Sequence, residues 1–209
     1  MIGRHQRRQR LDVLTIDGFC EQLESLGGVH RVFFIGDSPR LEDILNPQLE
    51  QLGLKIEEVN RIALTHGHID HIGGLTEICE HSSPEIFVHE NDADDLKSLG
   101  IKSIAYIKDG DNIRLGRRNQ RVIHTPGHTE GSVCLHDNEI ILTGDTAFPG
   151  GYFGRTDLPS GDWRKLIDSL DKLSRLDVRV MLPGHGEPLL SEASSHLRLA
   201  RKTVELVRY

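Results

Sequence analysis

Four apolar segments of this chain each end in a short polar turn, and this repeated arrangement constrains the fold more than any other feature. The apolar segments end at Thr65, Thr125, Thr143 and Leu182. The turns after them carry seven side chains of types that bind metals: His66, His68, Asp70, His71, His128, Asp145 and His185. Open α/β architectures place their functional sites at the carboxyl ends of strands. The repetition therefore indicates one shared site, because four unrelated surface turns have no reason to carry the same residue types.

The first of these turns, Thr65–His71, is the densest, with three histidines and one aspartate in the six residues after the threonine. No folding requirement asks for that composition. Neutral imidazole is the commonest metal ligand, and a carboxylate among imidazoles suits a divalent ion such as zinc. His66 and His68 share a direction in an extended chain, whereas Asp70 and His71 lie beyond a turn. The spacing thus indicates two adjacent metal ions.

The motifs around these candidate ligands resemble those of a known family. The motifs THGHIDHIGG, HTPGHTEGS, GDTAFPGGYFGRTDLPSGD and LPGHGEP resemble those of the metallo-β-lactamase superfamily. More narrowly, they resemble its glyoxalase II-like branch, the hydroxyacylglutathione hydrolases and their short relatives. The resemblance runs from about Val32 to Pro188. It implies an α/β (α+β) fold, the four-layer αββα sandwich of that superfamily, in which the ligands from separate strand ends converge at one edge between two sheets.

The resemblance also implies how the ligands divide between two divalent metal ions per chain. The first ion would be held by His66, His68 and His128. The second would be held by Asp70, His71 and His185, with Asp145 bridging the two. The ligand types favour zinc, and iron and manganese suit them as well.

This ligand set predicts hydrolysis. Two adjacent cations lower the pKa of a bridging water from about 15.7 to about 7 and so supply hydroxide at neutral pH, with Asp70 orienting the nucleophile. We find no dedicated proton donor beyond Asp70 and Tyr152. That favours a leaving group as acidic as a thiol, whose pKa is about 8.5. The leading prediction is therefore a hydrolase for a small thioester of the hydroxyacyl-thiol type.

The loop from Phe148 to Pro159 supplies the candidate substrate residues. The resemblance places Arg155 where a basic residue meets the carboxylate of glutathione, and an ion pair with Asp157 or Asp162 is the structural alternative. Tyr152 and Phe153 are predicted to wall the pocket, with packing anchors as the alternative. Full-length glyoxalase II has a further helical domain after its last metal histidine, whereas this chain ends 24 residues after His185. A small thioester of unspecified thiol is therefore the prediction, rather than a glutathione thioester.

Composition sets further limits. A chain of 209 residues that is 37% hydrophobic fits one domain spanning residues 1–209, in which residues 1–30 match the family poorly and 1–10 read as a basic tail. The net charge of −7 disfavours nucleic acid as the main partner. No apolar run approaches the roughly 20 residues that a membrane span requires. Three scattered cysteines favour a reducing cytoplasm. The oligomeric state is not readable.

The periodicity predicts the remaining elements. Strands are expected at Val32–Ile35 and Glu85–Val88, and in a meander from Leu115 to Leu142. Helices are expected at Pro47–Gly53 and Asn91–Leu99. Two further helices, one capped by Asp162, carry apolar stripes that we expect to face the core. These stripes comprise Trp163, Leu166, Ile167, Leu170 and Leu173, and Leu197, Ala200, Val204 and Val207. His124 is predicted to be structural, and Asp37, shifted by one position from the family's usual acid, is a candidate support for the metal loops.

Three other functions remain open at this stage. A lactonase or phosphodiesterase could use the same two metals. A persulfide dioxygenase with a single iron often shares the GRTD loop, but its last histidine typically stands in a P-A-H-D context, whereas this chain reads Pro183-Gly184-His185-Gly186. A non-catalytic binding protein is the third class, disfavoured because all seven ligands are present.

Overall fold

The computed structural model describes residues 14–15, 32–33, 55–115 and 118–207, which form two five-stranded sheets. The first sheet contains, in spatial order, β2 (Val32–Phe33), β1 (Leu14–Thr15), β3 (Arg61–Ala63), β4 (Glu85–His89) and β5 (Ile104–Ile107). All of its paired strands are parallel. The second sheet contains β12 (Val180–Pro183), β9 (Ile140–Gly144), β8 (Val133–His136), β7 (Arg118–His124) and β6 (Asn112–Leu115). It is antiparallel except for the β12–β9 pair.

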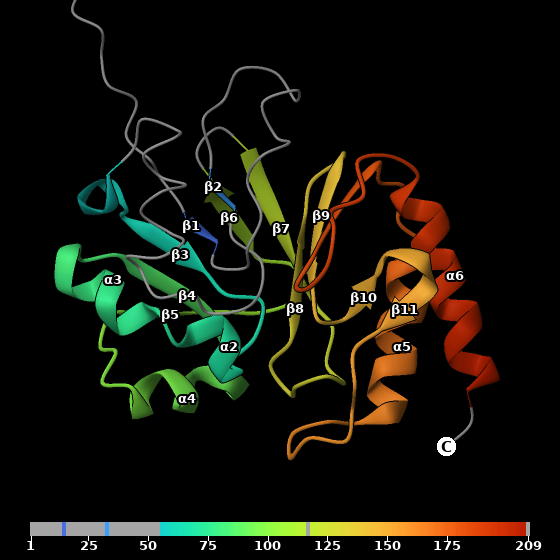
Figure 1. Ribbon diagram of the computed structural model, residues 1–209, viewed down its shortest axis with the longest axis horizontal. Coiled ribbons are helices and arrows are strands. Elements are labelled where there is room, and N and C mark those ends of the chain that lie inside the picture. The colour runs from blue at the N-terminus through green and yellow to red at the C-terminus, as the bar shows by residue number, and fades with distance from the viewer. Residues whose placement is uncertain (1–13, 16–31, 34–54, 116–117, 208–209) are drawn as a thin grey trace, which may run out of the picture.

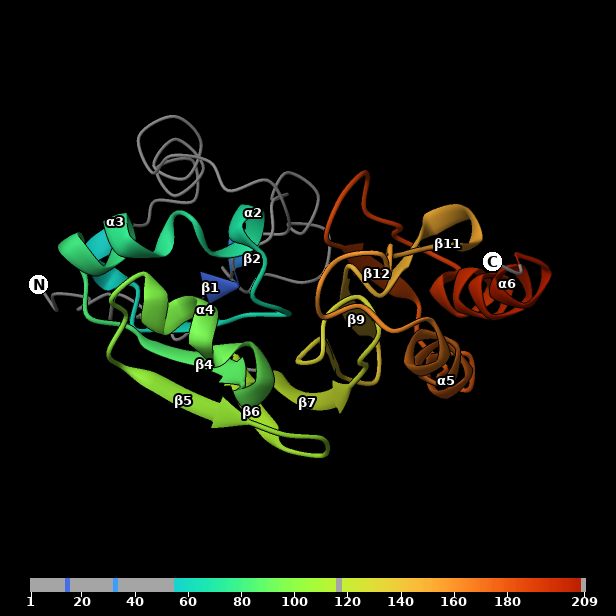
Figure 2. The same cartoon turned by 90° about the horizontal axis from the view of Figure 1, so that it is seen from below.

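Helices cover the outer face of each sheet, which gives the four-layer αββα sandwich (Figures 1 and 2). The first sheet is covered by α2 (Ile69–Ile72), α3 (Leu75–His81) and α4 (Ala93–Ser98). The second is covered by α5 (Trp163–Leu173) and α6 (Ala193–Leu206). The short elements are η3 (Ile56–Glu58), η4 (Glu90–Asp92), η5 (Pro149–Gly151) and the hairpin of β10 (Ala147–Phe148) and β11 (Tyr152–Phe153). Among the residues that the structure describes, no helix is both long and apolar enough to cross a bilayer.

Three apolar layers hold these four layers together. The layer between the first sheet and its helices includes Ile62, Leu75, Ile78, Ile86 and Leu96. The layer between the two sheets includes Ala63, Val122, Leu135, Leu142 and Leu182. The layer beneath α5 and α6 includes Ile123, Ile141, Leu166, Leu170 and Leu197. Both faces of each sheet are therefore buried, which explains why the strands are apolar runs rather than alternating polar and apolar residues.

Neighbouring residues along a strand belong to different layers. Ile62 packs under the helices while Ala63 faces the second sheet, and Val122 faces the first sheet while Ile123 packs under α5 and α6. This follows from the two-residue period of side chains in a strand. A slip of one residue would exchange the two faces of a strand, so the periodicity fixes the register of each strand. The register in turn fixes the residue at which the following turn begins.

The carboxyl ends of the ligand-bearing strands lie at one edge of the sandwich. β7 and β9 are each antiparallel to β8, and β12 is parallel to β9, so β7, β9 and β12 all point the same way. The main-chain N–H of Val133, opposite His124 in the β7–β8 pairing, donates to the carbonyl oxygen of Thr65 at 2.8 Å. This bond brings the turn after β3 to the same edge.

Most elements expected from the sequence are present. The meander forms β6 to β9, and Asp162 caps α5. Both apolar stripes face the core except Val207, which follows the end of α6 and is not part of the core cluster. The helix expected at Asn91–Leu99 is divided into η4 and α4, and β5 and the β10–β11 hairpin were not predicted. The expected helix Pro47–Gly53, the end of the strand Val32–Ile35, the basic tail and Asp37 lie outside the described residues.

The cap of α5 provides a test of the fold. Asp162 accepts hydrogen bonds from the main-chain N–H groups of Arg164 at 2.8 Å and Lys165 at 3.0 Å. We expect Asp162→Ala to destabilise the protein by about 1 kcal/mol, because helix N–H groups lose their acceptor. For a chain of this size that lowers the melting temperature by roughly 2–4 °C. Asp168→Ala, in the exposed middle of α5, is the control. Equal melting curves for the two variants would contradict the assignment.

Candidate metal centre

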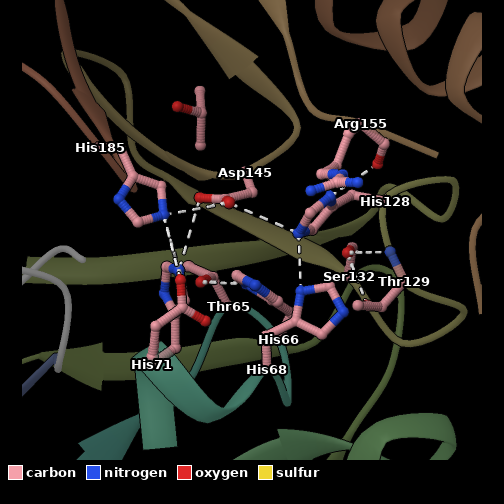
Figure 3. A network of polar contacts seen from close by, with 12 residues as sticks. Thr65, His66, His68, His71, His128, Thr129, Ser132, Asp145, Arg155 and His185 are labelled. Carbon is pink, nitrogen blue, oxygen red and sulfur yellow. Dashed lines mark hydrogen bonds and ion pairs between the residues drawn. The ribbon is translucent and has the colours of Figure 1, made fainter. Parts of the chain in front are cut away.

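Seven side chains of the metal-binding type meet at the edge where the strands end. Figure 3 labels all of them except Asp70. His66 and His68 follow β3, and Asp70 and His71 lie on α2. His128 follows β7, Asp145 follows β9 and His185 follows β12, so each strand end contributes to the group.

The group contains a first cluster of three imidazoles, His66, His68 and His128. Their ring nitrogens all lie within 4.8 Å of one another, and Nδ1 of His68 is 2.8 Å from Nε2 of His128. Three nitrogens at this separation surround the volume that one tetrahedral divalent ion occupies.

A second cluster lies beside the first and consists of Asp70, His71 and His185, again with ligand atoms within 4.8 Å of one another. Nε2 of His185 is 3.4 Å from Oδ2 of Asp70 and 3.4 Å from Nε2 of His71. These are the two groups of three that the resemblance implies. The structure adds a third combination, His66 with His71 and Asp145, because the ring of His66 in the first cluster lies 3.9 Å, centroid to centroid, from that of His71 in the second.

The buried Asp145 spans the two clusters. Its Oδ2 lies 3.4 Å from Nε2 of His128 and 3.3 Å from Nε2 of His185, and its Oδ1 lies 3.5 Å from Nε2 of His71. A carboxylate that reaches imidazoles of both clusters has the position of a bridging ligand.

The protonation of the cluster suits a divalent cation. Burial and the surrounding imidazoles lower the pKa of His66 well below its usual value, and burial lowers the pKa of His68 and brings that of His128 to about 4. The rings are therefore neutral at pH 7. Nε2 of His66 is buried without a hydrogen-bond partner, while its Nδ1 contacts Thr65 Oγ1 at 3.3 Å. His128 Nδ1–H donates to the carbonyl of Arg155 at 2.8 Å, which leaves its Nε2 lone pair for a metal.

Two glycines allow the backbone to approach Asp145 closely. A Cβ at Gly184 would lie 1.9 Å from Oδ1 of Asp145, and a Cβ at Gly154 would lie 1.8 Å from its carbonyl oxygen. Neither distance is possible between non-bonded atoms. Both positions therefore require glycine, because a side chain at Gly184 would displace the Asp145 carboxylate and one at Gly154 would displace the Asp145 main chain.

A cavity of about 440 Å³ opens onto the clusters. The cluster residues His68, Asp70, His128, Asp145 and His185 form its floor. The other lining residues are mostly apolar: Ile69, Phe148, Phe153, Gly154, Arg155 and Leu158.

The three predicted substrate residues differ in their position relative to the cavity. Arg155 lines the cavity and also forms a two-pronged ion pair with Asp157 at 2.7 and 2.6 Å, so the structural alternative for Arg155 is realised beside the cavity. Phe153 lines the cavity and packs edge-on against Trp163, with ring centroids 5.6 Å apart. Tyr152 is 71% exposed and is not among the residues that line the cavity.

Sequence reasoning missed Ile69, Phe148 and Leu158 in the cavity and Asp92 beside the metal loops. Asp92 follows the carboxyl end of β4, which is the same positional signal that identified the metal ligands. His124 lies outside the clusters, as predicted. Its Nε2 contacts the carbonyl of Glu130 at 2.9 Å, and its ring stacks on His89 with centroids 4.0 Å apart.

Comparison with known proteins agrees with this geometry. Residues 35–185 match the model of the metallo-beta-lactamase superfamily. Hydroxyacylglutathione hydrolase GloC of Haemophilus influenzae is 33% identical over 177 residues, covering 73% of this chain and 83% of that protein. The hydroxyacylglutathione hydrolase of Aeromonas salmonicida is 34% identical over 130 residues, covering 62% of this chain but 48% of its own length. A crystal structure of TTHA1623 in a di-iron-bound form is 27% identical, with a TM-score of 0.60 and coverage of 79% of this chain and 83% of that one.

The chain belongs to the metallo-β-lactamase superfamily. Within the superfamily, its relatives place it in the glyoxalase II-like branch, and the clusters of histidine and aspartate are those of a metal-dependent hydrolase.

The contact of Gly184 with Asp145 yields a prediction about metal binding. We expect Gly184→Ala to lower the affinity for divalent metal roughly 10–100-fold, the range found when a ligand loses its positioning contacts. The measurement is metal content per chain after dialysis against graded chelator. Gly186→Ala is the matched control: its φ of +82° disfavours alanine, but no atom lies within 4 Å of the added Cβ. Wild-type metal retention by Gly184→Ala would refute the bridging position of Asp145.

Proposed function

We propose that the protein is a dinuclear metal-dependent hydrolase that cleaves a small thioester. The observation that carries this proposal is the pair of ligand clusters, spanned by Asp145, on the floor of a cavity whose walls are mostly apolar. The cavity volume suits a small molecule.

The residues of the first cluster would hold one ion and those of the second cluster the other, with Asp145 between them. The bound ions supply a water of lowered pKa at neutral pH and positive charge for the developing oxyanion. Zinc is the expected metal because imidazole and carboxylate suit it. Iron is the second candidate, supported by the di-iron form of the related TTHA1623.

The chain's own residues position the reactants. The Asp70 carboxylate lies at the cavity surface and is 42% exposed, so it is able to accept a hydrogen bond from the attacking water and orient it. Phe148 and Phe153 form apolar wall next to the clusters and reduce the access of bulk water to the reacting carbonyl. Hydrolysis then proceeds by attack of water on that carbonyl and departure of the thiol.

The leaving group decides between thioesters and other esters. Among the described residues that line the cavity, those outside the clusters carry no carboxyl, hydroxyl, thiol or ammonium group that could protonate a leaving group. A thiolate leaves without such help because the pKa of a thiol is about 8.5, whereas an alkoxide requires a proton. This favours a thioester substrate over a lactone.

The proposal does not specify which thiol forms the substrate thioester. GloC and the Aeromonas protein are hydroxyacylglutathione hydrolases by name, which supports a hydroxyacyl thioester. Arg155, however, is the one cation that lines the cavity in the described chain, and Asp157 already pairs with it.

We place the reaction in the cytoplasm, with neither nucleic acid nor membrane as partner, in keeping with the acidic charge and the free Cys79 and Cys134.

A substrate panel on metal-loaded protein tests the proposal. We expect about two metal ions per chain, and a kcat/KM for S-lactoylglutathione well above that for a lactone or a phosphodiester. Two ions with faster lactone or phosphodiester cleavage would move the assignment to those substrates. A single iron with oxygen uptake on glutathione persulfide, and no thioester cleavage, would replace the hydrolase with a dioxygenase.

The role of Asp70 gives a quantitative prediction. We expect Asp70→Asn to lower kcat/KM for the thioester by about 10²–10⁴-fold, because an amide neither accepts the water's proton nor orients it as a carboxylate does. Steady-state kinetics measure this. Glu80→Gln, an equivalent change at an exposed position of α3, should leave kcat/KM unchanged. Wild-type kinetics in Asp70→Asn would exclude the proposed role.

A further inference from the structure

A buried carboxylate that belongs to neither cluster lies behind the metal loops. Asp92 ends η4 and is 3% exposed. Its Oδ2 accepts hydrogen bonds from the main-chain N–H of Gly67 at 2.9 Å and from Oγ1 of Thr129 at 2.7 Å. Its Oδ1 accepts a third from the N–H of Gly131 at 2.7 Å. Three donors satisfy the desolvated carboxylate, which removes the penalty of burying it.

The donors belong to the two loops that form the first cluster. Gly67 stands between His66 and His68 in the sequence, and Thr129 follows His128. One carboxylate therefore joins the segment that supplies two imidazoles to the segment that supplies the third. None of these three hydrogen bonds goes to a residue of the second cluster.

The position of Asp92 makes this arrangement distinctive. Asp92 is the N-cap residue of α4, where an aspartate ordinarily accepts hydrogen bonds from the first N–H groups of its own helix. Its side chain makes no such bond here. The carboxylate instead points to the metal loops, so its function in the fold lies there rather than in starting α4.

A relay of hydroxyl groups fixes the orientation of Thr129. An ionised carboxylate only accepts hydrogen bonds, so Thr129 Oγ1 donates to Asp92. Ser132 Oγ, 2.7 Å away, then donates to Thr129 Oγ1 and accepts from the Thr129 N–H at 3.0 Å. The turn that follows His128 is thus tied to Asp92 by side chain and main chain together.

Glycine at position 131 permits the close contact. A Cβ there would lie 2.4 Å from Oδ1 of Asp92. The absence of a side chain at Gly131 lets the N–H of this loop reach the carboxylate directly, without an intervening water.

We propose that Asp92 is a positioning residue for the first metal cluster, setting the separation between the His66–His68 segment and His128. This inference rests on the metal-dependent function proposed above. It requires that loss of the carboxylate weakens metal binding by the first cluster while the second cluster keeps its affinity.

The test is Co²⁺ titration of chelator-stripped protein, followed by visible absorption and by competition with a chelator. In a His185→Ala background the first cluster is read alone, and in a His128→Ala background the second is read alone. We expect Asp92→Asn to weaken Co²⁺ binding roughly 10–100-fold in the first background and to alter the ligand-field spectrum there, because an amide turns a donor towards one of the three N–H or O–H groups. The second background should be unaffected.

Asp94→Asn is the matched control, because it makes the same change on α4 at an exposed carboxylate that pairs with Lys97. It should leave both clusters unchanged. Thr129→Val removes one donor of the three, together with the acceptor of Ser132 Oγ, and leaves the two main-chain bonds of Asp92 in place. A smaller loss confined to the first cluster therefore supports the proposal even where Asp92→Asn folds poorly. Equal weakening of both clusters, or wild-type Co²⁺ binding in both Asp92→Asn and Thr129→Val, would overturn it. Failure of the wild-type protein to bind metal would instead refute the metal-dependent function, and this inference with it.

Discussion

The packing of the two sheets on their shared apolar layer is the constraint on which the site depends. His66 and His68 follow a strand of the first sheet, whereas His128, Asp145 and His185 follow strands of the second. The distance between these groups is set by the packing of residues such as Ala63, Val122 and Leu135, none of which is itself a candidate ligand. Protein interiors are close-packed and yield little, so a small shift in this layer moves one set of ligands against the other. The hydrogen bond between Val133 and Thr65 and the three bonds of Asp92 reinforce the same junction at the edge.

The site brings together buried imidazole and carboxylate groups whose close approach is unfavourable without a cation between them. Several buried imidazoles lie within a few ångströms of one another, and burial lowers their pKa values, so the cluster is kept neutral at the expense of favourable hydration. The backbone at Gly154 and Gly184 packs so closely against Asp145 that neither position has space for a side chain. Buried side chains with metal-binding lone pairs, gathered this closely, are typical of sites in which a bound ligand supplies the interaction that water no longer provides. A bound cation accepts the lone pairs that the fold has turned inward, and it stabilises the folded state by the free energy of its binding.

Most of the groups that support the first cluster belong to the same loops as its imidazoles, and Asp92 comes from a separate segment. Five of the seven candidate ligands stand on turns after strands, whereas Asp70 and His71 lie on α2. The groups that support the first cluster are main-chain amides, hydroxyls and one buried carboxylate. The hairpin of β10 and β11 adds the apolar wall, and α6 packs against η5 next to it. The chemistry of the site is therefore local, but its geometry is a property of all four layers.

The sequence by itself determined the ligand types, the strand ends on which they stand and the faces of the long helices, because local spacing and two-residue or 3.6-residue periodicity fix these features. It left open whether Arg155 contacts substrate or pairs with Asp157 or Asp162, and whether Tyr152 walls the pocket or anchors the loop; the residues that line the cavity include Arg155 but not Tyr152. Asp92 also follows a strand end, but the sequence did not distinguish it from an ordinary helix cap, which is the usual role of an aspartate at a helix start. These matters depend on distances between segments far apart in the chain. Only the packing of the two sheets decides those distances, and no local pattern of residues records them.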